Sequence, residues 1–138
     1  MRDDLPGVEP QEHAPEATAP HGWYQDRLDH GILAFQACGA CAAAVFPPRS
    51  RCPRCGHPGL HWRRSRGRAV VYAATTIAPR GAEPYCVALV DVAEGFRMMT
   101  NIVGVPAADV RIGDHVALRF ERRDETAIPV FGPEEEAR

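Results

Sequence analysis

The chain contains four cysteines in two closely spaced pairs, Cys38 with Cys41 and Cys52 with Cys55. A gap of two residues lets both thiolates of a pair reach the same metal ion, and a second pair completes a tetrahedral shell of four sulfurs. Residues 42–51 separate the two pairs and are long enough for a short hairpin. The spacing therefore predicts a zinc ribbon with two metal-binding turns, and disulfide bonds are the alternative.

The predicted metal site has a structural role. Four protein ligands close the coordination sphere of Zn²⁺ and leave no position for a water molecule or a substrate. Iron is the competing metal, because Cys52-Pro53-Arg54-Cys55-Gly56 looks like a rubredoxin turn and a four-sulfur site suits both metals. With iron bound, the protein would be a rubredoxin-like electron carrier. Gly39 and Gly56 each follow a cysteine, where such a turn often requires positive φ.

The remaining reactive residues form no recognisable catalytic set. Cys86 lies in an apolar run, residues 85–90, and is expected to pack in the core as a small hydrophobic residue. The six histidines and the carboxylates show no catalytic spacing, and Ser50 and Ser65 are the only serines. His57 and His61 flank the second cysteine pair and are expected at the surface. The sequence thus predicts a protein that is not an enzyme by itself.

The charge of the chain is unevenly distributed along its 138 residues, although the formal net charge is only −2. Residues 1–20 are acidic and rich in proline, which predicts a disordered tail. Residues 21–133 hold 14 arginines against 10 acidic side chains.

We find no secretory signal and no apolar run of transmembrane length, so we expect a protein of the reducing cytoplasm that does not enter a membrane.

The rest of the pattern predicts a mainly β protein. A short helix is expected over residues 21–31, where Gly31 provides a C-terminal stop, and the ribbon follows over residues 32–65. Residues 66–133 contain β-rich segments at 68–78, 85–92, 96–105, 115–121 and 128–131, with one helical turn near 106–112, and residues 134–138 form a second tail. This order favours a five-stranded OB-fold barrel over an unspecified β-sandwich.

This combination resembles domain-of-unknown-function family 35, the acyl-CoA-associated zinc-ribbon/OB-fold proteins. The resemblance runs from Trp23 to Pro133, and all four ribbon cysteines are present. The matching segments are Gly31-Ile32-Leu33, Phe46-Pro47-Pro48-Arg49, Cys52-Pro53-Arg54-Cys55-Gly56, Trp62, Arg66-Gly67-Arg68, Val87-Ala88-Leu89-Val90, Ile112-Gly113-Asp114-His115-Val116 and Phe131-Gly132-Pro133.

The resemblance implies an accessory subunit. Proteins of this family are typically found with thiolase-fold enzymes, including thiolases, acyltransferases and steroid side-chain aldolases, or fused to hydratase-like domains. In some assemblies they help to form the acyl-CoA channel, and the catalytic residues belong to the partner. We therefore expect a hetero-oligomer in lipid or steroid metabolism, with zinc as a structural cofactor of this chain.

Two groups of residues are candidates for contact with CoA or with the partner: the arginines Arg63, Arg64, Arg66 and Arg68, and the aromatic residues Trp23 and Tyr24. Guanidinium groups suit phosphates, and strand alternation would place Arg64, Arg66 and Arg68 on one face. A solvated face, or ion pairs with an acidic partner, is the alternative. Binding of single-stranded nucleic acid is a further alternative, disfavoured because the barrel sequence lacks alternating aromatic and cationic residues.

Hydrophobic residues on the helix and on the third barrel strand could also form contacts. Trp23 and Tyr24 either dock the helix onto the rest of the protein or anchor it to a partner. For the neighbours Met98 and Met99, strand alternation places one side chain in the core and leaves the other outside.

Overall fold

The computed structural model of the protein describes residues 20–134. The predicted tails fall outside this range, except that Pro20 begins the helix and Glu134 follows the last strand. In chain order the elements are α1 (Pro20–Asp29), β1 (Ala34–Cys38), β2 (Ala44–Val45), β3 (Leu60–Arg64), β4 (Arg68–Ile77), β5 (Tyr85–Val92), β6 (Phe96–Ile102), the 3₁₀ turn η1 (Ala107–Asp109), β7 (His115–Arg123) and β8 (Thr126–Pro133).

The first sheet is a small antiparallel ribbon with strand order β2-β1-β3. Gln36 in β1 lies opposite Val45 on one side and Trp62 on the other. Its side-chain amide is buried and exchanges two hydrogen bonds with the backbone of Arg49, donating at 2.9 Å and accepting at 2.7 Å. The amide thereby fixes the long connection that carries the second cysteine pair.

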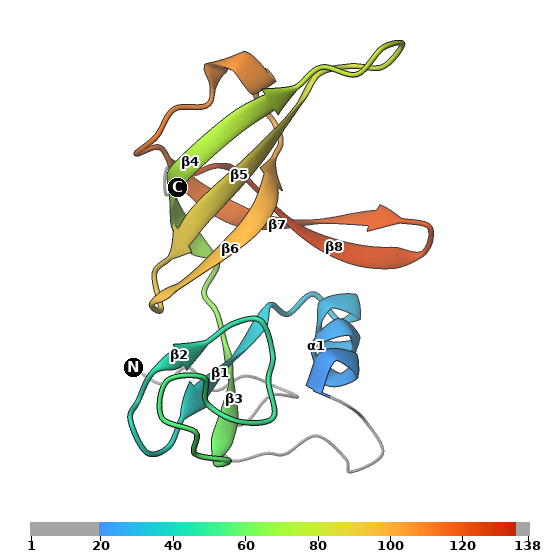
Figure 1. Cartoon of the computed structure of the whole chain (residues 1–138). Helices are drawn as coiled ribbons and strands as arrows, with labels where there is room; N and C mark the ends of the chain where they lie inside the picture. Colours follow the sequence, from blue (N-terminus) through green and yellow to red (C-terminus); the bar gives the residue numbers. More distant parts are fainter. Residues whose placement is uncertain (1–19, 135–138) are drawn as a thin grey trace.

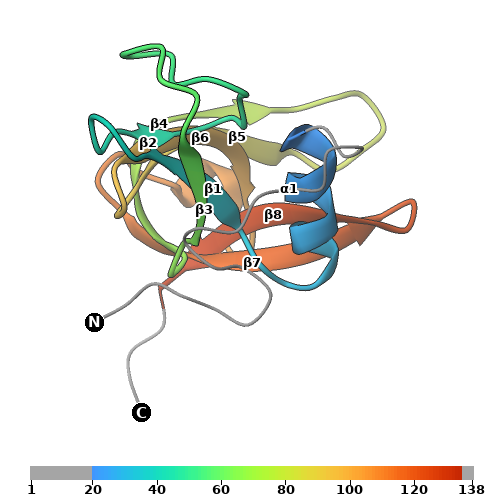
Figure 2. The ribbon, with the colours of Figure 1, turned by 90° about the horizontal axis from the view of Figure 1, so that it is seen from below.

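The second sheet is a closed barrel with strand order β4-β5-β6-β8-β7, and β7 pairs with β4 to complete the circuit. A register shift between Val71 and Ala73 bends β4, which helps a five-stranded sheet to close. The barrel stands above the ribbon and α1 in Figure 1, and Figure 2 shows it end-on. The predicted mainly β fold, with a ribbon followed by a five-stranded barrel, is confirmed.

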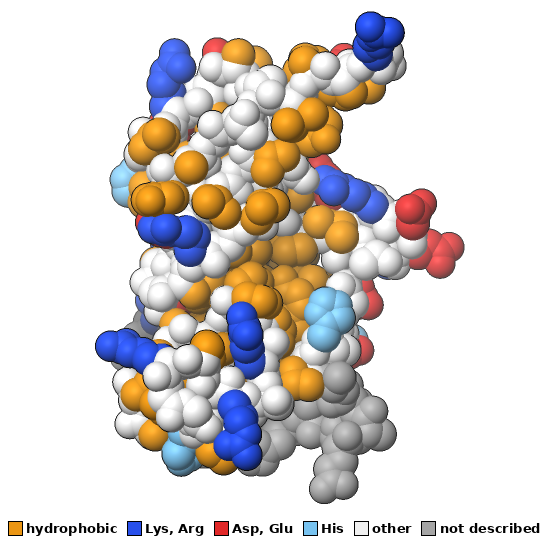
Figure 3. Space-filling model, viewed as in Figure 1, with side chains coloured by type: hydrophobic (Ala, Val, Ile, Leu, Met, Phe, Trp, Pro, Cys, Tyr) orange, Lys and Arg blue, Asp and Glu red, His pale blue; other side chains and the backbone are white. Residues whose placement is uncertain are grey.

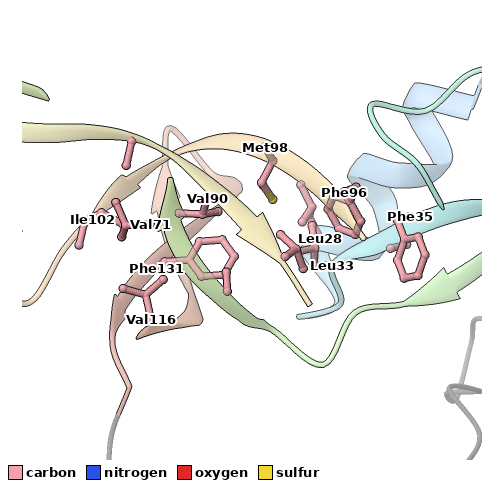
Figure 4. Close-up of a cluster of buried hydrophobic side chains, with 14 of the residues drawn as sticks. Leu28, Leu33, Phe35, Val71, Val90, Phe96, Met98, Ile102, Val116 and Phe131 are labelled. Carbon is pink, nitrogen blue, oxygen red and sulfur yellow. The ribbon is translucent and has the colours of Figure 1, made fainter. Parts of the chain in front are cut away.

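The interior of the barrel consists of alternate side chains from all five strands. Phe131, Val90 and Val71 are almost completely buried and lie close to one another in Figure 4. Met98 is 5 % exposed whereas Met99 is 69 % exposed, as the alternation predicted. Cys86 is also buried, which confirms its expected place in the core. The period-two pattern of the sequence therefore determines which side chains fill the barrel.

Three phenylalanines join the ribbon to the barrel. The Phe96 ring, at the start of β6, lies 5.0 Å from the Phe35 ring of β1 and 4.9 Å from the Phe46 ring. Leu28 and Leu33 belong to the same buried cluster (Figure 4). Helix, ribbon and barrel thus share one continuous hydrophobic core, which holds the two sheets in a fixed relation.

Polar contacts reinforce this joint. The carboxylate of Glu94, in the turn between β5 and β6, accepts a hydrogen bond from the Ser65 hydroxyl and another from the Arg66 N–H, both at 2.8 Å. Ser65 is 2 % exposed, and its oxygen also accepts the Gly67 N–H at 2.9 Å. The short linker between β3 and β4 is therefore fixed to the barrel by side chains.

The helix α1 lies beside β8. Gln25 donates a hydrogen bond to the Ala127 carbonyl at 3.2 Å, and the Ala127 N–H donates to Asp29 at 3.3 Å. These bonds satisfy backbone groups on the edge of β8 that faces the helix. Gly31 has φ of 78° and its N–H bonds to the Leu28 carbonyl, as expected for the residue that ends a helix.

Candidate metal centre and basic groove

The four ribbon cysteines meet at one point. Cys38 ends β1, Cys41 follows in the adjoining turn, and Cys52 and Cys55 lie in the second turn; all four sulfur atoms are within 4.8 Å of one another. The Sγ atoms of Cys38 and Cys55 are 3.6 Å apart, and those of Cys41 and Cys52 are 3.7 Å apart. A tetrahedral zinc ion with Zn–S bonds of about 2.3 Å separates its sulfurs by roughly 3.8 Å. The residues therefore fit a tetrahedral four-thiolate metal site.

The backbone of both turns supports negatively charged sulfur. The N–H groups of Ala40 and Cys41 donate to Cys38 Sγ at 3.3 and 3.4 Å, and the Arg54 N–H donates to Cys52 Sγ at 3.4 Å. The N–H of Cys41 and that of Ala40 lower the pKa of Cys38 to about 6. The pKa of Cys52 is lowered in the same way. The thiolates of Cys38 and Cys52 are thus stabilised before any metal contributes, whereas the contact with the Cys38 thiol raises the pKa of Cys55 to about 12.

Disulfide bonds, the alternative for these residues, do not form. All five cysteines of the chain are free, and the shortest sulfur contacts given above are far longer than a disulfide bond of about 2.05 Å.

The expected positive φ angles occur one residue after the second cysteine of each pair. Gly56 has φ of 81°, as predicted, but the matching residue of the first turn is Ala42 with φ of 67°, not Gly39. Gly39 is instead closely packed, because a Cβ atom there would lie 2.9 Å from Nε2 of His61, which would have to shift, and 3.3 Å from the Gly59 carbonyl oxygen. The prediction of positive φ at Gly39 was wrong, because the left-handed residue of each turn follows the second cysteine of the pair and Gly39 follows the first.

The two histidines beside the ribbon differ. His57 is exposed, as expected, and its Nδ1 accepts the Gly59 N–H at 2.8 Å. His61 is half-buried, and so less exposed than expected, because it lies on β3 opposite Ala37. It lines a cavity of about 440 Å³ together with Arg63 and Glu94.

The larger groove, of about 550 Å³, lies where the linker meets β7 and β8. Arg64 at the end of β3, Arg66 in the linker and Arg68 at the start of β4 all line it. Arg63 faces the other cavity. Strand alternation predicted that Arg64, Arg66 and Arg68 lie on one face. All three line the groove, although residues 65–67 are not part of a strand. A volume of this size is typical of small-molecule sites.

A fourth arginine, Arg119 of β7, also lines the groove, and sequence reasoning missed it. A Cβ atom on Gly132 would lie 2.4 Å from Arg119 Cζ, and one on Gly104 would lie 2.7 Å from its Nη1. The guanidinium therefore occupies a slot that exists because residues 104 and 132 are glycine. No local sequence pattern indicates this, since the three residues come from three separate segments.

The acidic side chain at the groove is Glu134, which forms an ion pair with Arg68 and lies 3.9 Å from His115 Nδ1. Within residues 20–134, four arginines against one carboxylate line the groove and give it a positive charge, which suits an anionic ligand.

The aromatic candidates on α1 have different environments. Tyr24 is 9 % exposed, its ring lies 5.6 Å from that of Phe46, and burial raises its pKa to about 12. Tyr24 thus docks the helix onto the core, which removes it from the candidate contact residues. Trp23 is only half-buried, and the Arg27 guanidinium stacks on its ring at 4.7 Å.

Among the described residues no helix is long and apolar enough to cross a membrane.

Fold and site together define a protein with a rubredoxin-like zinc ribbon followed by an OB-fold barrel. The chain matches the family domain described as "ChsH2, rubredoxin-like zinc ribbon domain" over residues 25–61 and "ChsH2, C-terminal OB-fold domain" over residues 62–121. A DUF35 domain-containing scaffold protein of Methanothermobacter thermautotrophicus is 31 % identical over 65 % of this chain and 72 % of its own length. The protein belongs to the DUF35 family.

Other relatives differ in length. The probable enoyl-CoA hydratase alpha subunit of Thermomonospora curvata is 36 % identical over 106 residues, which are 73 % of this chain but 33 % of that protein. The chain therefore spans about a third of that relative's length.

Two of the similar solved structures differ in how closely they match this chain. One, titled "Ltp2-ChsH2(DUF35) aldolase", is 30 % identical with a TM-score of 0.75 and covers 87 % of this chain and 98 % of its own. The other is a protein of unknown function from the DUF35 family of Sulfolobus solfataricus, with a TM-score of 0.59 over 75 % of this chain and 80 % of its own. At 21 % identity the second supports the fold alone.

Proposed function

We propose that this protein is a non-catalytic subunit that binds and supports a thiolase-type acyl-CoA enzyme. The proposal rests on the structure titled "Ltp2-ChsH2(DUF35) aldolase". At 30 % identity, the alignment covers 98 % of that chain and 87 % of this one. The related DUF35 proteins described as scaffolds agree with an accessory role. On this account the partner performs carbon–carbon bond chemistry on a CoA thioester.

The state of the fifth cysteine supports the non-catalytic role. Cys86 is 1 % exposed, and burial raises the pKa of its thiol. A cysteine nucleophile needs access and a lowered pKa, and Cys86 has neither.

The four ribbon cysteines would hold a structural Zn²⁺ ion, which would link the two turns and stabilise the ribbon. The metal content of the purified protein tests this assignment. One equivalent of zinc is expected, whereas a red protein with one equivalent of iron would favour the electron carrier.

We assign the groove lined by Arg64, Arg66 and Arg119 to the phosphates of CoA. Its positive charge and volume support this assignment, because CoA carries a pyrophosphate and a 3′-phosphate. CoA titrated into the complex should bind more weakly as the salt concentration is raised. Dephospho-CoA, which lacks the 3′-phosphate, should bind more weakly than CoA at every salt concentration.

The test of the subunit role is purification of the tagged chain from its own cells under native conditions, followed by identification of stoichiometric partners. A thiolase-type subunit is the expected result. A hydratase partner is the second candidate, favoured by the Thermomonospora curvata relative. Recovery of nucleic acid, or of a redox enzyme, would overturn the proposal.

A further inference from the structure

The barrel carries a group of apolar side chains on its outside. Among residues 20–134 the exposed large hydrophobic side chains are Tyr72, Ile77, Tyr85, Met99 and Ile112. The first four lie on β4, β5 and β6. Ile112 precedes Gly113 and Asp114, whose backbone groups bond to Val71 of β4 at 2.8 and 2.9 Å. We name the outward side of β4, β5 and β6 the outer face.

Strand register brings these side chains next to one another. Tyr85 lies opposite Ile77, and Met99 lies opposite the half-buried Leu89. Figure 3 shows apolar side chains spread over the front of the barrel, where Figure 1 places these three strands. The barrel interior already has its own residues on the opposite side of each strand, so the fold does not require apolar groups here.

The charges of the outer face are balanced. Arg97 of β6 donates to Asp91 of β5 at 2.6 Å, and its guanidinium lies 3.4 Å from the centroid of the Tyr72 ring. A surface for nucleic acid would present unbalanced cations. Tyrosine, methionine and arginine are the residue types enriched at the centre of protein interfaces. The composition therefore favours a protein partner.

The size of the outer face agrees with the centre of an interface. Three strands about 4.8 Å apart and about eight residues long present roughly 400 Å². A stable complex buries about 800 Å² on each partner, so the face would supply about half and the β4–β5 loop and Ile112 would lie at its rim.

We propose that the outer face is the surface on which the thiolase-type partner subunit docks. The inference rests on the proposed function, and continuity with the basic groove supports it. Arg68 lines the groove, and Tyr72 lies four residues further along the same strand, about 13 Å away. A partner seated on the outer face therefore reaches the rim of the groove, as a CoA path shared by two subunits requires.

The experiment measures binding of the partner subunit, recovered by native purification and then produced separately, to the wild-type chain and two variants. Met99→Asp places a carboxylate in the outer face, and Ser50→Asp places the same group on an exposed residue of the ribbon loop. We expect Met99→Asp to weaken binding at least tenfold and Ser50→Asp to leave it unchanged. Tyr72→Ala, which adds no charge, should weaken binding severalfold, with unaltered melting and metal content as the control for folding.

The outcomes separate the two proposals. Equal affinity of wild type and Met99→Asp would overturn the docking face while leaving the subunit role intact. Failure of the wild-type chain to bind any thiolase-type subunit would overturn the proposed function, and the docking face with it. Sedimentation of the chain alone provides a further check. A dimer that Met99→Asp dissociates would show that a second copy, not the partner, occupies the face.

Discussion

The carboxylate of Glu94 is expected to stabilise the folded protein, because it holds the linker between ribbon and barrel. It accepts two hydrogen bonds of 2.8 Å, from the Ser65 hydroxyl and the Arg66 N–H. Hydrogen bonds to charged groups contribute about 1.5–3 kcal/mol each, and the lower end applies because Glu94 is only half-buried. Glu94→Ala should therefore lower the free energy of unfolding by about 3 kcal/mol, or the melting temperature by roughly 10 °C.

Urea unfolding followed by circular dichroism measures the loss. Glu94→Gln keeps the shape but not the charge, so its loss should be intermediate. Glu83→Ala serves as the matched control, since Glu83 is an exposed glutamate of the β4–β5 loop. Hydrogen exchange of the Arg66 amide should accelerate in Glu94→Ala. A loss below about 0.5 kcal/mol, equal to that of the control, would refute the role of the carboxylate.

Three further predictions concern the metal, a surface charge and the groove. Cys52→Ser removes one of four sulfurs and should abolish both metal content and ribbon structure; a folded variant with a full equivalent of metal would contradict this. The hydrogen bond from Arg97 holds the pKa of Asp91 below its usual 3.8, so the associated stability is present above that value and is lost as the pH falls through the lower folded pKa. Arg97→Met should return the pKa of Asp91 toward 3.8 in an NMR titration, and an unchanged pKa would exclude Arg97 as the cause. Arg119→Ala should weaken CoA binding to the complex about tenfold, whereas Arg122→Ala at the hairpin end should not; equal effects would argue against the groove.

Local signals in the sequence were sufficient for much of the fold. The cysteine spacing predicted the four-sulfur cluster, because two residues between ligands fix the turn that joins them. Alternation predicted the opposite environments of Met98 and Met99. The β-rich segments expected at 85–92 and 96–105 became β5 and β6, joined by a tight turn in which Gly95 has φ of 107°.

Features that depend on distant segments could not be predicted. The slot of Arg119 requires Gly104 and Gly132, which meet only after the barrel closes. The final hairpin was predicted too short, because its turn residues Asp124 and Glu125 adopt φ of 51° and 66°, a conformation usually signalled by asparagine and glycine. The burial of Tyr24 likewise depends on Phe46, far along the chain.

This chain is proposed to act by supporting a partner enzyme. The most direct test of this role is turnover of an acyl-CoA substrate by the purified partner subunit, by this chain, and by the two reconstituted together. We expect this chain alone to have no activity and the complex to be at least tenfold more active than the partner alone. Activity of the isolated chain, or a partner whose rate is the same with and without this chain, would rule out the supporting role.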